Sequence, residues 1–482
     1  MIALSASLAQ NLHEIEEYMG HSADLCVRRF ELSPGREAAV LYLASLVDKA
    51  LIDEFVMQPM LESGKPEEGT AEKVELPVHL QQTVSSVEKA ASALLQGCSL
   101  VLVDGLSAAK SGLTSGGERR AVSEPSAESV VRGPRESFNE SLLTNIGLIR
   151  RRLASPHLRT ERLMIGSVTN TPVSILYLEG TAKEEYVTEV KERLGSIRLD
   201  GILESQYLEE YLEEKQGYTP FPTVFNTERP DRVAAGLLEG RVAVLMEGTP
   251  VALVVPATIG LFLYSNEDYY QRYDIATFLR ILRTFTFLIS IAMPGFYVAL
   301  LTYHQEMIPT PLLVALTGQR EGVPFGIAIE VFLMEMTFEI LREAGIRLPK
   351  TIGSAVSIVG GLVLGQAAVE AGLVAPGTVI AVSVTAISSF CTPAFNIAIS
   401  ARLIRFVLIL LCAALGAFGL FFGLILTVIH LNTLRSLGVP YLSPISPFHG
   451  KDWRDLFIRA PLRRMTQHPE ELRTREEGGE RG

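Results

Sequence analysis

The chain has 482 residues, of which 20% are charged, and its formal net charge is −11. Because a nucleic-acid partner requires a basic face that displaces counterions from the phosphate backbone, this acidic balance argues against nucleic-acid binding. The four cysteines are scattered without a CxxC pair, which indicates neither a disulfide framework nor a zinc site.

The N-terminal part of the chain has the patterns of a soluble α/β module, predicted over residues 1–107. It begins without the basic n-region of an export signal, so we expect a cytosolic start. Residues 25–32 and 37–43 are two β-rich runs on either side of turn residues, which predicts a hairpin. Residues 48–60 have apolar side chains at helical spacing, and residues 99–103 are typical of a short buried strand.

A second α/β module is predicted over residues 136–260, after a Gly/Ser-rich linker at residues 108–135. It opens with an amphipathic helix at 139–153, which ends in three arginines where cations suit the helix dipole. Four strands are expected, at 160–169, 173–179, 241–246 and 251–255. Neither module contains a Rossmann fingerprint, a P-loop, a GxSxG or an HExxH motif, so we expect no catalytic residues, no metal site and no cofactor.

Residues 261–435 carry long apolar runs that predict an α-helical polytopic membrane domain of about four to five helices. The clearest runs are 281–303, 352–372, 378–396 and 404–431. The first contains Pro294-Gly295, which would kink it. A short turn separates the second and third runs, so we expect them to form an antiparallel hairpin. The fourth is the longest and most purely apolar.

The segment 325–341 is apolar but contains Glu330, Glu335 and Glu339. A bare carboxylate in the centre of a bilayer costs several kcal/mol, so this helix cannot simply face lipid. It is either an interfacial or re-entrant helix with its acids in water, or a protein-lined helix whose acids face a water path. Glu335 and Glu339 lie one turn apart on one helical face, whereas Glu330 points away from them.

Basic residues at both ends of the membrane domain favour a cytoplasmic location for both, which requires an even number of crossings. Arg280 and Arg283 mark the start of the first run, and the segment 436–482 after the last run is basic. Four spans with a non-crossing 325–341 segment satisfy this condition. That arrangement places Arg402 and Arg405 on the outer side, so a model with five spans stays open.

Small side chains recur along one stripe of the run 352–372, and the next run is rich in hydroxyl groups. The stripe contains a GxxxG motif, which is typical of close helix packing and equally suits a narrow pore wall gated by flanking apolar residues. The candidate pore-lining residues are Ser357, Val359, Gly361, Val363, Gly365, Ala368, Ser383 and Ser388.

Three strings carry a resemblance to a known family: YHQEMIPTPLLVALTGQREGVPFG at 303–326, EGTPVALVVPAT at 247–258 and SLGVPYLSPISPF at 436–448. The chain resembles the GerA family of spore germination proteins, specifically its A subunits, and the likeness extends over nearly the whole chain. The sporulation-stage paralogue of the same family is the nearest alternative.

This resemblance implies a multi-pass subunit of a nutrient germinant receptor in the spore inner membrane, with N- and C-termini in the cytoplasm. Its partners would be a permease-like B subunit, which senses the nutrient, and a lipoprotein C subunit. The A subunit would self-associate as a ring, a pentamer, around an ion-conducting pore in membrane lipid. Four acidic residues would then form a vestibule at the pore mouth: Glu306, Glu321, Glu330 and Glu335.

The leading hypothesis is therefore a nutrient-gated ion channel subunit rather than an enzyme. A non-conducting scaffold that assembles the receptor is the first alternative. An ion-coupled transporter is another, although no inverted repeat with paired broken helices is evident. A membrane-anchored enzyme would have to use His304 and Glu306, and an HxE pair alone is weak support for catalysis.

Overall fold

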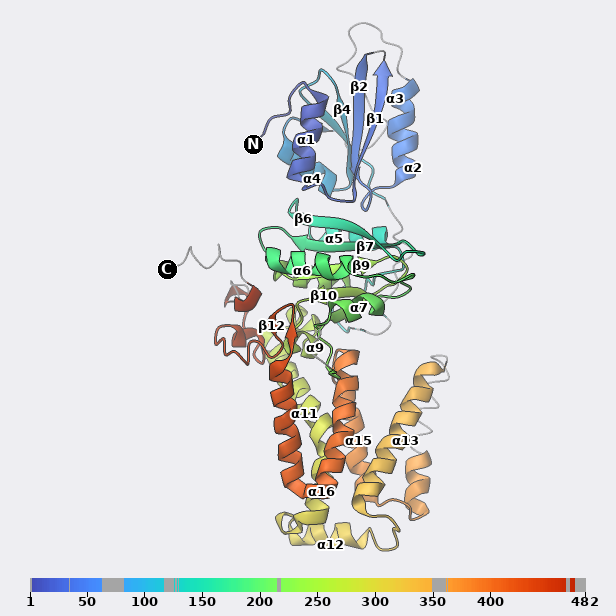
Figure 1. Ribbon diagram of the computed structural model, residues 1–482, viewed down its shortest axis with the longest axis vertical. Coiled ribbons are helices and arrows are strands. Elements are labelled where there is room, and N and C mark those ends of the chain that lie inside the picture. The colour runs from blue at the N-terminus through green and yellow to red at the C-terminus, as the bar shows by residue number, and fades with distance from the viewer. Residues whose placement is uncertain are drawn as a thin grey trace.

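The computed structural model describes residues 2–33, 35–62, 82–116, 125, 128, 130–214, 218–348, 361, 363–464 and 469–472. Two α/β layers are stacked end to end above a bundle of long helices (Figure 1). The predicted fold class, an α/β N-terminal region followed by a helical region with apolar helices, is confirmed.

The first sheet is antiparallel, with the strand order β1-β2-β4-β5-β3. The predicted hairpin is confirmed, because Leu25 of β1 pairs with Leu43 of β2. Alternate residues of β2 point to opposite faces, so Leu41 packs under α1 and α4 while Val40 packs under α2 and α3. The strands are β1 (Leu25–Ser33), β2 (Arg36–Leu43), β3 (Gln82–Val84), β4 (Cys98–Val103) and β5 (Ala109–Leu113). The helical segments are α1 (Leu8–Tyr18), α2 (Lys49–Ile52), η1 (Asp53–Met57), α3 (Gln58–Glu62) and α4 (Val87–Leu95).

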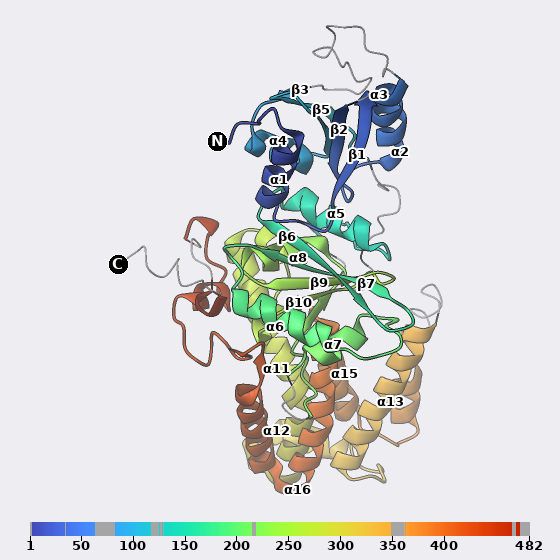
Figure 2. The ribbon, with the colours of Figure 1, turned by 45° about the horizontal axis from the view of Figure 1, so that its top comes forward.

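The second sheet repeats this topology, with the order β6-β7-β9-β10-β8. Its strands are also antiparallel, and helices cover both faces. Helices α5 and α8 cover one face, and α6 and α7 cover the other (Figure 2). The strands are β6 (Leu158–Ile165), β7 (Thr171–Leu178), β8 (Phe225–Thr227), β9 (Val242–Met246) and β10 (Ala252–Val255). The helices are α5 (Leu142–Arg152), α6 (Glu184–Gly195), α7 (Gln206–Leu212) and α8 (Pro230–Leu238).

A buried ion pair joins the two α/β layers. Arg150 of α5 donates from Nε to the Asp24 carboxylate at 2.6 Å, and both side chains are almost inaccessible to solvent. Ser22 and Ser45 complete the carboxylate's hydrogen bonds. Gly147 of α5 lies so close to the Ser45 carbonyl that a Cβ there would be 2.2 Å from its oxygen. The two layers are therefore in direct contact.

The C-terminal half is helical and leads away from the second sheet. Two of its helices, α11 and α16, are long and apolar enough to cross a membrane by length and composition. The helices are α9 (Ile259–Leu263), α10 (Glu267–Tyr270), α11 (Tyr273–Tyr303), α12 (Thr310–Gly318), α13 (Ile327–Arg347), α15 (Pro376–Phe390) and α16 (Phe395–Thr433). Residues 363–370 form a further helical stretch. Helix α11 continues through Pro294, and Gly295 allows Cys412 of α16 to approach closely.

The apolar run 404–431 is a helical hairpin, so its treatment as one continuous span was wrong. Gly416 has φ 60° and ψ −141°, a conformation essentially restricted to glycine, and the chain reverses there. The second arm packs against the first, because a Cβ on Gly423 would lie 2.3 Å from Leu408. A straight helix over all 39 residues of α16 would extend about 58 Å, well beyond the thickness of a bilayer core.

Both open ends of the α16 hairpin lie against the second α/β layer. Ser400, near the start of the first arm, donates to the carbonyl of Pro220. His430, near the end of the second arm, contacts Thr219 through Nε2 at 2.9 Å. The hairpin turn lies at the far end of the bundle, where Tyr303 donates to the carbonyl of Ala413 at 2.7 Å. The chain thus returns to the end of the bundle next to the second α/β layer before its C-terminal segment (Figure 1).

Candidate functional site

The predicted hairpin of small and hydroxyl-bearing helices is present over the described residues 363–390. Gly372, with φ +66°, ends the helical stretch 363–370, and Pro376 occupies the first turn of α15. The two helices are in contact at Gly365, where an added Cβ would lie at an ordinary van der Waals distance of 3.6 Å from Val379. The turn is fixed from outside, because the amide of Ala375 donates to Glu330 at 2.6 Å.

The candidate pore-lining residues do not share one environment. Gly361, Val363 and Ser383 are exposed, Ala368 is half-buried, and Gly365 and Ser388 are buried. Ser357 and Val359 lie outside the described residues. On α15, the Thr385 and Ser389 hydroxyls donate to carbonyls of their own helix. Hydroxyls satisfied in this way are compatible with an apolar surrounding, so their number alone does not indicate water.

An exposed face of the 363–370 stretch combines one apolar and two polar side chains. Val363, Gln366 and Glu370 are spaced by three and four residues, so they lie on one helical face, and all three are exposed. Gln366 Nε2 donates to Glu370 Oε1 at 2.8 Å. Gln366 and Glu370 are not among the predicted site residues, although polar residues at i, i+4 spacing inside an apolar run are a signal in the sequence. Val363, Gln366 and Glu370 are called the polar face below.

The four candidate vestibule acids fall into two groups. Glu306 and Glu321 are exposed and flank α12, which lies at the end of the bundle far from the α/β layers (Figure 1). Glu330 is fully buried and pairs with Arg320, whose Nη1 lies 2.5 Å from it. Glu335 is also buried, and Arg405 Nη1 lies 2.7 Å from its carboxylate. Only the first two therefore present a free carboxylate surface in this chain.

Of the two alternatives for the segment 325–341, the structure contradicts the one that keeps Glu330 and Glu335 in water, because both acids are buried against protein. Glu330 and Glu335 are 0% and 1% exposed, and Arg402 Nη1 lies 2.8 Å from Glu339. Each acid faces protein and has an arginine partner, which offsets much of the cost of burying its charge. The partners Arg402 and Arg405 belong to the first arm of α16, which sequence spacing could not reveal.

A loop over residues 218–223 connects the second α/β layer to both arms of α16. Besides the contacts of Thr219 and Pro220, Phe221 packs with its ring centroid 6.2 Å from that of His430. Ser436, just after α16, donates to the carbonyl of Thr223 at 2.7 Å. A movement of this loop would therefore be transmitted to both ends of the hairpin.

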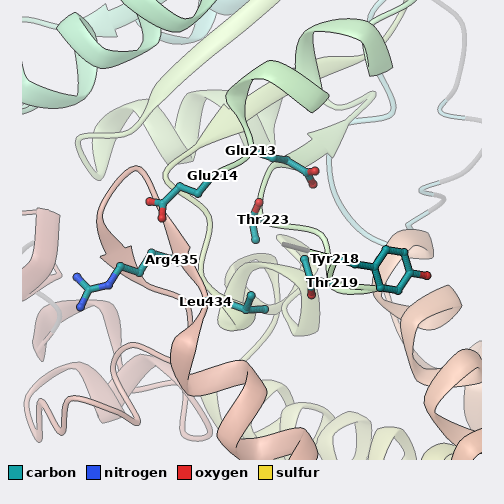
Figure 3. Close-up of a pocket in the computed structure, with 7 residues that line it drawn as sticks. All are labelled: Glu213, Glu214, Tyr218, Thr219, Thr223, Leu434 and Arg435. Atoms are coloured by element: carbon teal, nitrogen blue, oxygen red, sulfur yellow. The ribbon is translucent and has the colours of Figure 1, made fainter. Parts of the chain in front are cut away.

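A small cavity of about 170 Å³ lies beside this loop (Figure 3). It is lined by Glu213, Glu214, Tyr218, Thr219, Thr223, Leu434 and Arg435. The Glu213 and Glu214 carboxylates point in different directions in Figure 3, and Glu214 accepts from the amide of Gly438 at 2.7 Å. Burial raises the pKa of Glu213. Nearby Glu209 has a pKa raised to about 7, mainly by burial and further by the charge of Glu213.

Within the described part of the chain, no group of three or more His, Cys, Asp or Glu side chains is placed to hold a metal ion. His304 accepts a hydrogen bond from the amide of Ala417 through Nε2, at 3.2 Å. Glu306 is exposed two residues further on. The geometry thus gives His304 a structural contact at the α16 turn.

The chain matches the model of the family described as "Bacillus/Clostridium GerA spore germination protein" over residues 13–471. It is 46% identical to Spore germination protein KA of Bacillus subtilis over 478 residues, which cover 98% of this chain and 88% of that protein. It is 40% identical to the Uncharacterized membrane protein YfkQ of Bacillus subtilis, covering 97% and 91% of the two chains. It is 37% identical to Spore germination protein GerLA of Bacillus cereus, and the alignment covers 99% of this chain and 98% of that protein.

One solved structure is also similar. It is the N-terminal domain of the A subunit of the Bacillus megaterium spore germinant receptor GerK3, with 33% sequence identity and a TM-score of 0.41. The match covers 53% of this chain and 97% of that domain. On the match over residues 13–471 and the long alignments to its relatives, the chain belongs to the GerA family of spore germination proteins.

Proposed function

We propose that this chain is the A subunit of a nutrient germinant receptor and that copies of it assemble around a gated ion path in the spore inner membrane. The polar face carries this proposal. A carboxylate and an amide exposed to lipid would cost several kcal/mol, so Gln366 and Glu370 need either water or another subunit against them. A ring of subunits around a hydrated path supplies both.

The same face suggests how a path would be controlled. In a ring, Val363 of each copy would repeat at one level, and Glu370 would repeat two turns further along the helix. Rings of apolar side chains gate by dewetting, and rings of carboxylates attract cations. Gly361 and Gly365 lie four residues apart on the opposite face of the helix, where Gly365 contacts α15.

The proposed topology places both ends of the membrane domain in the cytoplasm. The chain passes along α11, back along α13, down the 363–370 stretch, up α15, and down and up the two arms of α16. Arg402 and Arg405 then lie at the end of the bundle nearest the α/β layers, because Ser400 contacts Pro220 there. This placement removes the conflict with the positive-inside rule that arose for Arg402 and Arg405 in the four-span arrangement with a non-crossing 325–341 segment.

A permease-like B subunit and a lipoprotein C subunit complete the proposed receptor. Nutrient binding on the B subunit would shift a closed-to-open equilibrium of the ring, and the 218–223 loop would couple the α/β layers to α16. The contacts from Thr219 to His430 and from Pro220 to Ser400 support this role.

Conductance of the purified chain in planar bilayers, with and without the permease-like partner, tests the proposal. Val363→Ala should increase spontaneous ion passage, and Glu370→Gln should reduce the preference for cations. Glu343→Gln is the matched control, because Glu343 is an exposed acid of α13 paired with Arg347. A chain that passes no current in any combination would be a scaffold instead. Selectivity that responds equally to Glu370→Gln and Glu343→Gln would contradict the assigned pore wall.

A further inference from the structure

A second cavity, of about 700 Å³, lies between the second α/β layer, α9–α10 and the C-terminal segment. Its size is typical of small-molecule and lipid sites. Much of its wall is apolar, including Leu238, Leu261, Val254 and Leu462. Leu238 and Leu462 are 53% and 61% exposed, so apolar surface is accessible at the mouth. It is called the junction cavity below.

The acidic side chains of the junction cavity are already engaged. Glu239 accepts from Arg241 Nε at 3.1 Å, and Asp455 pairs with Arg280 at 2.7 Å. Asp452 accepts from the amide of Glu470 at 2.9 Å. Glu471 contacts His449 at 3.0 Å. Each of these four carboxylates thus already accepts at least one hydrogen bond or ion pair from the protein.

The basic side chains of the junction cavity are not all engaged. Lys451 and Arg454 are exposed lining residues, and among the described residues neither has an acidic partner. Arg241 is 5% exposed and uses Nε and Nη1 for Glu239 and the carbonyl of Pro256. Its Nη2 has no protein acceptor within the described chain. Lys451, Arg454 and Nη2 of Arg241 are thus hydrogen-bond donors without a protein acceptor among the described residues, and charged donors of this kind suit the oxygens of a phosphate.

The junction cavity lies at the level where α11 leaves the soluble layers. Tyr264 and Tyr269, two of its lining residues, stack on Arg280 of α11 with 4.6 Å and 5.2 Å between the guanidinium carbon and the ring centroids. Arg280 immediately precedes the apolar run of α11. The adjoining C-terminal segment also exposes large apolar side chains, with Phe448 70% and Ile458 56% exposed.

We propose that the junction cavity binds an anionic phospholipid of the adjoining leaflet. Lys451, Arg454 and the Nη2 group of Arg241 would hold the headgroup phosphate, and the apolar wall would contact the glycerol and upper acyl region. Basic pockets next to membrane helices are typical sites for anionic headgroups. The site is formed within one chain and does not depend on ion conduction, so it would tie the position of the C-terminal segment to the lipid composition of the membrane.

Lipid retention by the full-length chain in detergent micelles tests this proposal. Phosphatidylglycerol and phosphatidylcholine with identical acyl chains are added separately, and bound lipid is measured by native mass spectrometry. The wild type should retain more phosphatidylglycerol than phosphatidylcholine. The double variant Lys451→Gln with Arg454→Gln should weaken its binding about 10- to 30-fold, because each basic residue near an anionic headgroup contributes roughly 1 kcal/mol.

Two further variants make the result decisive. Arg272→Gln with Arg435→Gln removes the same charge from exposed positions outside the junction cavity and should change retention little. Ala235→Phe fills the cavity without changing charge and should also weaken binding, which decides the matter if the charge variant misfolds. Equal losses in the cavity and control double variants would overturn the proposal. Full displacement of the lipid by glycerol 3-phosphate would also overturn it, since the site would then belong to a soluble anion.

Discussion

Glu335 and Arg405 form an ion pair of 2.7 Å in which each side chain is only 1% exposed. Arg405 also donates from Nε to the carbonyl of Ser290 at 2.6 Å, so one guanidinium joins α13, α16 and α11. Glu335 Oε1 and Arg405 Nη2 have no hydrogen-bond partner among the described residues. The pair is therefore a three-helix contact in which each charge depends on the other.

Arg405→Met should destabilise the helical bundle by about 3–5 kcal/mol, because it leaves the Glu335 carboxylate buried without its partner. The double variant Arg405→Met with Glu335→Leu should recover most of that loss, since two apolar side chains of similar size have no charge to desolvate. Thermal unfolding of the detergent-solubilised chain measures both. Arg347→Met is the control, because the Arg347 and Glu343 side chains are 78% and 60% exposed. A double variant as unstable as Arg405→Met would show that packing, not charge, dominates this contact.

Gly416→Ala should destabilise the α16 hairpin by about 1–3 kcal/mol, since an alanine cannot adopt φ 60° and ψ −141° without strain. Its Cβ would also lie 3.0 Å from the Tyr303 ring. The midpoint of thermal unfolding reports the loss. Gly318→Ala is the matched control, because Gly318 has open space around its Cβ position and ends the short helix α12. Equal midpoints for the two variants would rule out a conformational requirement at Gly416.

Sequence patterns predicted the elements whose signals are local. The β1–β2 hairpin follows from two β-rich runs and a turn, and the structure pairs Leu25 of β1 with Leu43 of β2. The α16 hairpin was missed because Gly416 lies in an apolar run without any polar turn residue, and hydropathy does not distinguish a turn there from a continuous helix. The partners of Glu335 and Glu339 were missed for another reason. Arg405 and Arg402 lie 70 and 63 residues away, and no local spacing encodes such a contact.

The candidate site was predictable as a region but not in its detail. Small residues at helical spacing placed Gly365 on a packed face, and the structure shows it against α15. The same pattern does not predict which residues next to Gly365 remain exposed. Gln366 and Glu370 lie on a different face from the glycines, so the glycine spacing carries no information about this polar pair.

Arg150→Leu should loosen the contact between the two α/β layers and destabilise the chain by about 3–5 kcal/mol, because Asp24 would remain buried without its partner. Burial alone would raise the pKa of Asp24, but the Arg150 charge and the hydrogen bonds from Arg150, Ser45 and Ser22 outweigh it and lower the pKa. This stabilisation is thus present above the unfolded-state pKa, near 4, and is lost as the pH falls through the lower folded-state value.

Limited proteolysis and unfolding between about pH 2 and pH 7 test this contact, over the range where aspartate titrates. Arg151→Leu is the control, because the neighbouring Arg151 makes only a hydrogen bond of 3.4 Å to the Gly116 carbonyl among the described contacts. The wild type should be more stable to unfolding than Arg150→Leu at neutral pH, and this difference in stability should disappear in acid. If the difference in stability between the wild type and Arg150→Leu stays constant across this pH range, the contact depends on packing rather than on charge.

Glu209→Gln should stabilise the second α/β layer at alkaline pH and have little effect near pH 4.5. Burial raises the pKa of Glu209 from its ordinary 4.5 to about 7, and the charge of Glu213 adds to this, while the hydrogen bond from Asn226 opposes it. Between these two pKa values the folded chain binds more protons than the unfolded chain, so stability falls as the pH rises. The full effect is about 3 kcal/mol, from 1.36 kcal/mol per pKa unit.

Unfolding of the wild type and Glu209→Gln in buffers from about pH 4 to pH 9, a range that brackets both pKa values, measures this effect. The difference between the two should be near zero at the acidic end, grow through neutral pH and level off above the folded-state pKa of about 7. Glu210→Gln is the matched control, because Glu210 is the next residue of α7 and is exposed. The stability of Glu210→Gln should equal that of the wild type at each pH. A Glu209→Gln profile parallel to that of the wild type would mean that Glu209 stays ionised in the folded chain, and that a conformational change or water must then accommodate its charge beside the 218–223 loop.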